Sequence, residues 1–85
     1  MALLEREFAS RPRNYKVGLQ LISIRLMEEA YEEGISLTKQ LLEYSDAPPE
    51  ILYWQAEFYS RRGNTVESWL SLEAYAQAVL NLQRL

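Results

Sequence analysis

The sequence of 85 residues contains no cysteine and no histidine, and only three glycines and three prolines. A chain without cysteine and histidine has no thiol nucleophile, no disulfide, no imidazole base and no zinc site of the usual type. No glycine-rich phosphate loop occurs, and the serine and threonine hydroxyls have no histidine to activate them. We therefore expect a protein that is not an enzyme and that holds no cofactor and no metal.

Long apolar runs and an excess of positive charge are missing as well. The stretch 51–54 is among the longest apolar runs, far below the roughly 20 residues that cross a bilayer. Twelve acidic and nine basic residues give a net charge of −3, which disfavours non-specific binding to nucleic acid. Residues 1–13 mix apolar and charged side chains, unlike a secretory leader. The sequence predicts a soluble protein, with a cytoplasmic location favoured and a periplasmic one left open by the lack of cysteine.

The spacing of the apolar residues is helical throughout. They recur at steps of three and four in every long segment, and no segment alternates strictly as a strand would. The pattern predicts an all-α fold of about five helices, over residues 2–9, 15–29, 31–44, 49–62 and 64–85. Their number and the chain length are sufficient for one small domain.

The sequence also repeats at an interval of 34 residues. A shift by this interval places Gly34 on Ser68 and Ile24 on Phe58, so that small residues fall on small ones and apolar residues on apolar ones. Residues 55–68 resemble the tetratricopeptide repeat, in which two small residues, an aromatic residue and a corner glycine stand at fixed spacing. The corresponding residues are Ala56, Tyr59, Gly63 and Ser68. The preceding unit departs from this pattern, because Ile22 and Arg25 replace its first small residue and its aromatic residue.

The resemblance implies an α-solenoid of antiparallel helix–turn–helix repeats: a partial repeat at 1–12, one repeat at 15–48 and one at 49–85 with an extended final helix. It also implies a protein-interaction module, an adaptor or co-chaperone, that binds a peptide or a helix of a protein partner in a concave groove. The first helix of each repeat lines this groove, with Lys16, Leu19, Gln20, Ser23, Tyr53, Glu57 and Arg61.

A second hypothesis treats the chain as a structural, self-assembling repeat fragment of a larger protein. Residues 67–75 are similar to a helix in the repeat tails of bacterial periplasmic zincin metallopeptidases. The size and acidity of the chain are similar to those of the small repeat-type co-chaperones of type III secretion needle subunits. Apolar residues cover roughly 160° of the final helix, more than one neighbouring helix covers. This favours a homodimer through Trp69, Tyr75, Val79 and Leu82.

Some features have two interpretations. Tyr53 and Trp54 either form a platform for a ligand or pack on neighbouring helices, and we favour packing for Trp54 and the groove for Tyr53. Lys16, Arg61 and Arg62 either bind a carboxylate or phosphate or are solvated surface charges, which is the commoner case. The carboxylates at 28, 29, 32 and 33 would raise one another's pKa in a catalytic cluster, but we expect a solvated helix end.

Overall fold

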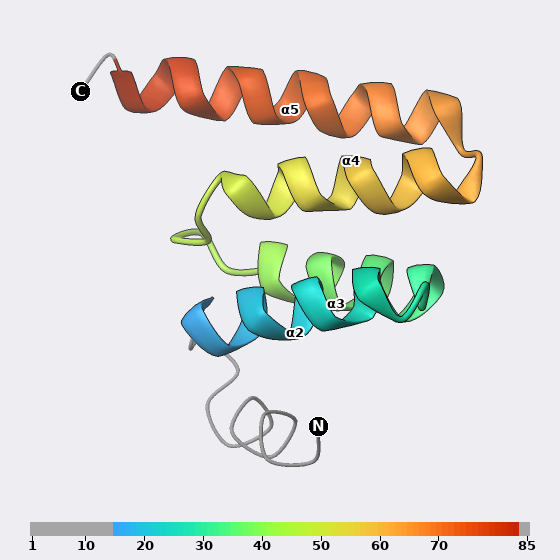
Figure 1. Cartoon of the computed structure of the whole chain (residues 1–85). Coiled ribbons are helices and arrows are strands. Elements are labelled where there is room, and N and C mark those ends of the chain that lie inside the picture. Colours follow the sequence, from blue (N-terminus) through green and yellow to red (C-terminus); the bar gives the residue numbers. More distant parts are fainter. Residues whose placement is uncertain (1–14, 84–85) are drawn as a thin grey trace.

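A computed structural model of the chain describes residues 15–83, and these residues form four helices connected by short turns (Figure 1). The helices are α2 (Tyr15–Met27), α3 (Tyr31–Leu42), α4 (Glu50–Arg62) and α5 (Thr65–Gln83). No strand occurs between residues 15 and 83, which confirms the all-α prediction for this part of the chain. The predicted helix at 2–9 and the partial repeat at 1–12 lie outside the described residues.

Two sharp corners reverse the chain, and both use a residue in the left-handed conformation. Glu29 has a φ of 59°, and the amide of Ala30 donates to the carbonyl of Arg25 at 2.9 Å. For this reason α2 ends at Met27, two residues before the predicted end. Gly63 has a φ of 90° and closes α4. Glycine is favoured there because it has no Cβ to clash in this conformation.

The helices pack in an antiparallel order. α2 and α3 form one pair, α4 lies on both members of that pair, and α5 packs on α4 (Figure 1). Among these four helices α3 and α5 do not contact each other, since α4 separates them. The resulting body is flat, with Cα extents of 37 × 32 × 16 Å.

The apolar core lies between α2, α3 and α4. Its buried members are Val17, Leu21, Ile22, Ile35, Leu41, Ile51 and Phe58. Phe58 is fully buried, and its ring lies directly against Gly34 of α3. Gly34 therefore lies at a close helix contact, because a side chain at this position would leave no space for the ring.

α5 packs on α4 through small polar residues. Ser68 and Ser71 are the only buried residues of α5, and the Ser68 hydroxyl donates to a backbone carbonyl of α4 at 3.0 Å. The Ser71 hydroxyl donates to Oε1 of Gln55 at 3.0 Å, and Nε2 of Gln55 donates to Oγ1 of Thr38 at 3.2 Å. Thr38 in turn donates to the carbonyl of Ile35 at 2.7 Å. A buried chain of hydrogen bonds thus connects α3, α4 and α5.

Candidate interaction surfaces

The predicted groove residues lie on the exposed sides of α2 and α4. On α2, Lys16, Gln20 and Ser23 are exposed, and Leu19 is half-buried against the core. Lys16, Leu19 and Ser23 recur at steps of three and four, so they share one side of the helix. Gln20 is turned about 40° beyond Lys16 and lies at the edge of that side.

On α4, Tyr53 is 42% exposed and lies at the centre of an aromatic cluster. Its ring meets the Trp54 ring edge-on, with 5.8 Å between the centroids, and the ring of Tyr75 from α5 at 5.7 Å. Trp54 is half-buried and packs against the core. These contacts position the Tyr53 ring at the surface without burying it, so it presents a pre-ordered aromatic edge.

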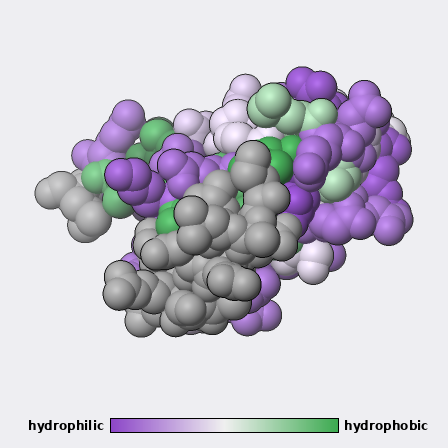
Figure 2. Space-filling model, turned by 60° about the horizontal axis from the view of Figure 1, so that its bottom comes forward, coloured by the Kyte–Doolittle hydropathy of each residue, from purple (hydrophilic) through white to green (hydrophobic). Residues whose placement is uncertain are grey.

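The arginines of α4 have acidic neighbours. Nε of Arg61 lies 3.6 Å from Oε2 of Glu57, one helical turn earlier, and Arg62 lies 3.0 Å from Glu32 of α3. Arg61, Arg62 and Glu32, with Glu28, stand at the end of the molecule that holds the α2–α3 and α4–α5 corners, where Figure 2 shows a hydrophilic surface. Both arginines are therefore already neutralised by carboxylates, which disfavours a strong anion site.

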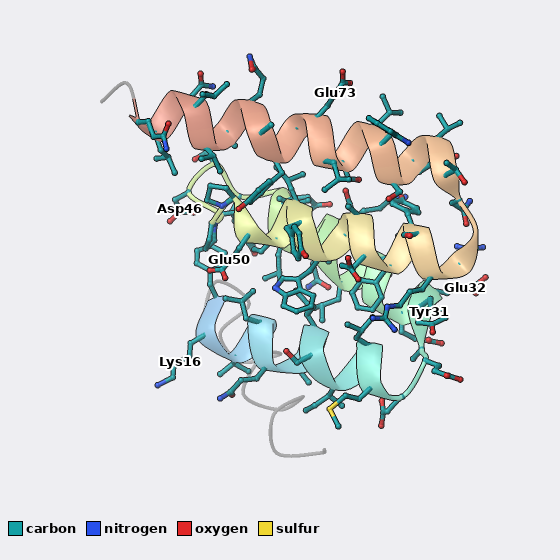
Figure 3. All side chains as sticks on the ribbon, turned by 45° about the horizontal axis from the view of Figure 1, so that its top comes forward. Lys16, Tyr31, Glu32, Asp46, Glu50 and Glu73 are labelled. Atoms are coloured by element: carbon teal, nitrogen blue, oxygen red, sulfur yellow. The ribbon has the colours of Figure 1, made fainter. Side chains whose placement is uncertain are left out.

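Lys16 lies at the opposite end of the molecule, as Figure 3 shows, near the start of α4 and far from Tyr31 and Glu32. The carboxylates at 28, 29, 32 and 33 are all exposed, and two of them form ion pairs with arginine. Their surroundings match those of a solvated helix end. Within residues 15–83 no group of three acidic side chains is arranged to hold a metal ion.

A second surface is the open side of α5. Trp69, Leu72 and Leu80 are 68%, 40% and 48% exposed, and Ala76 between them is exposed too. These four residues recur at steps of three and four and span about 80° of the helix circumference. We call them the α5 stripe. It contains no charged residue.

Of the four residues predicted for a dimer interface, only Trp69 belongs to the α5 stripe. Tyr75 and Val79 are half-buried on the side of the helix that faces α4. Leu82 lies beyond the end of α4, where it lines a shallow depression with Pro48 and other residues of the α3–α4 loop. Leu72, Ala76 and Leu80 were not among these four, because the apolar arc of α5 is wider than a single interface and does not indicate which part of it stays open.

The α5 stripe lies close to the Tyr53 cluster of α4. Tyr75 contacts Tyr53 across the α4–α5 boundary, and Leu72 and Ala76 are its helical neighbours, one turn before and one residue after. In Figure 1, α4 lies between α2 and α5, so the Tyr53 cluster stands at the boundary of α4 and α5. The exposed residues of α2 are polar apart from Met27, and those of the α5 stripe are apolar.

Comparisons of the chain with protein-family models, with curated proteins and with solved structures gave no match. In the part of the chain that the structure describes, no helix combines the length and hydropathy of a membrane span. Function is therefore inferred from the chemistry of the helix surfaces.

Proposed function

We propose that this chain is a protein-interaction module of the tetratricopeptide type that binds a peptide or a partner helix on the face formed by α2 and α4. The observation that carries the proposal is the exposed ring of Tyr53, held between Trp54 and Tyr75. Aromatic rings that are ordered before binding lose little conformational freedom on contact, which is why they act as anchors in interfaces.

The backbone supports the relation to helical repeats. The left-handed residues Glu29 and Gly63 stand 34 residues apart, and so do the helix starts Tyr31 and Thr65. At both corners the amide after the left-handed residue donates to the carbonyl five residues earlier, at 2.9 and 2.8 Å. Together with the packing of α4 on both helices of the preceding pair, these features support the proposal of one unit followed by a second.

The face offers both apolar and polar contacts to a partner. Tyr53 supplies apolar area at its centre, and the ion pair of Glu57 and Arg61 lies one to two turns further along α4. Lys16 adds a positive charge from α2. An extended peptide or a helix would gain affinity from the ring and orientation from the charged groups.

Site-specific photo-crosslinking tests this proposal. A photoreactive amino acid replaces Tyr53 in one variant and Lys39 in the control, because Lys39 is exposed on α3, outside this face. In the source cell the variant at 53 is expected to capture a distinct partner that the control does not capture. Identical products from both positions, or none from position 53, would contradict binding at this face.

The alternative function is that of a structural, self-assembling unit, such as a repeat segment within a larger protein of the periplasmic metallopeptidase kind. The exposed α5 stripe favours this alternative, because end-to-end packing of repeats buries the faces of terminal helices. A capture product with twice the mass of the chain would support self-assembly in place of partner binding.

A further inference from the structure

The α5 stripe is the largest apolar feature that the described helices leave open. The exposed residues of α2 and α3 are polar apart from Met27, and α5 alone exposes a row of large apolar side chains. A surface of this kind marks a contact site in soluble proteins. Because only one described helix carries such a row, a second copy of the chain can match it only by presenting its own α5.

We infer that a second copy of this chain covers the α5 stripe, with the two α5 helices antiparallel and Ala76 on the two-fold axis. The two leucines of the α5 stripe are symmetric about this position. Leu72 and Leu80 each stand four residues from Ala76. In an antiparallel pair, Leu72 of one copy therefore lies opposite Leu80 of the other copy. Trp69 and Gln83 each stand seven residues from Ala76 and are paired in the same way.

The small side chain at the centre of the pattern permits close approach. Helices pack with their axes about 8–10 Å apart, and the shorter distances require small residues at the crossing point. Ala76 provides such a residue, with a larger leucine one turn away on each side. A partner of unrelated sequence would have no need for this symmetry in α5.

The charges of α5 are compatible with the pairing. Glu67 and Glu73 are its only charged residues between 65 and 83, and Glu67 lies on the side of the helix opposite Ala76. Glu73 borders the stripe and points away from the body of the molecule in Figure 3. In the antiparallel pair the two copies of Glu73 are about 9 Å apart along the axis, a distance at which physiological salt screens much of their repulsion.

The available area indicates a weak dimer. The stripe exposes on the order of 400 Å² of apolar surface in each copy, most of it from Trp69 and the two leucines. This is about half of the roughly 800 Å² per partner that a standard interface buries. We therefore expect dissociation in the micromolar range and no obligate dimer.

Single-cysteine variants test the arrangement directly, since the natural chain contains no cysteine. In the dimer of Ala76→Cys, the new thiol faces the same thiol of the second copy, at a Cα separation suited to a disulfide. Oxidative crosslinking is expected to be at least roughly tenfold faster than in Ser36→Cys, a control on the exposed side of α3. Mixing Leu72→Cys with Leu80→Cys is expected to crosslink the two variants, whereas each of them alone reacts slowly.

Sedimentation equilibrium of the unmodified chain provides the second measurement. The wild type is expected to change from monomer to dimer between low-micromolar and near-millimolar concentration, and Leu80→Glu to stay monomeric with unchanged helix content. A wild type that is monomeric throughout, or equal crosslinking of Ala76→Cys and Ser36→Cys, would overturn the inference. Either result would mean that residues 1–14 or another protein cover the stripe, and neither would affect partner capture at Tyr53.

Discussion

The contact between Gly34 and Phe58 predicts that Gly34→Ala destabilises the protein, although alanine is the better helix former. A Cβ atom at position 34 would lie within 2.7 Å of three atoms of the Phe58 ring, namely Cε1, Cε2 and Cζ. The ring is fully buried, and Tyr31 stands against it with 6.5 Å between the ring centroids. The ring therefore has little freedom to move aside.

The change in the free energy of unfolding depends on the balance between helix propensity and overpacking. Alanine is favoured over glycine inside a helix by about 1 kcal/mol. Overpacking a tight core costs about 1–3 kcal/mol, and the clash here involves three ring atoms of a residue without access to solvent. We expect Gly34→Ala to lower the free energy of unfolding by about 1–2 kcal/mol, since the clash outweighs the gain in helix propensity. For a domain of this size the melting temperature should fall by roughly 5–15 °C.

Thermal and urea unfolding, followed by circular dichroism, measure this effect, and Ser36→Ala on the exposed side of the same helix is the control. In a Phe58→Leu background the smaller side chain leaves space for the new methyl group. There Gly34→Ala should cost at least about 1 kcal/mol less than in the wild type. The reasoning is refuted if Gly34→Ala melts at or above the wild-type temperature, because the ring would then not occupy the space over Gly34.

Three further predictions concern other elements. Gln55→Leu removes the central member of the buried hydrogen-bond chain, so the hydroxyls of Thr38 and Ser71 lose their bonds to it. In urea unfolding the free energy of unfolding should fall by about 2–3 kcal/mol. The control Gln40→Leu, at an exposed position, should lower it by no more than about 0.5 kcal/mol. Gly63→Ala meets no neighbouring atom, so its expected loss of about 1 kcal/mol in the same assay reflects only the left-handed backbone. Once a partner is captured, Tyr53→Ala should weaken binding at least about tenfold in calorimetry and Lys39→Ala should leave it unchanged.

Much of the helical framework could be predicted from the sequence. Recurrence of apolar residues at steps of three and four depends on local geometry alone, and it identified every helix between residues 15 and 83. The predicted ends of α2 and α3 were each two residues too late. The left-handed conformation of Glu29 explains the first difference, because a residue in this conformation does not continue the helix.

The position of Tyr53 on an exposed side of α4 also agrees with the sequence pattern, whereas its contact with Tyr75 could not be foreseen. These residues are 22 positions apart, and their meeting depends on how α5 is rotated about its own axis. Periodicity within α4 determines only which side of α4 is open. It contains no information on which side of α5 comes to lie beside it.

The orientation of α5 was decided by the tertiary structure. The apolar arc of this helix is wider than the side that one neighbouring helix covers, so hydrophobicity alone does not select the side that faces α4. The selected side carries Ser68 and Ser71, because their small side chains allow close approach and their hydroxyls satisfy Gln55 and a carbonyl of α4. This choice satisfies buried polar groups and leaves Trp69 exposed. The sequence by itself therefore determined where the helices run, and the packing of α5 on α4 determined which apolar surface remains open to a partner.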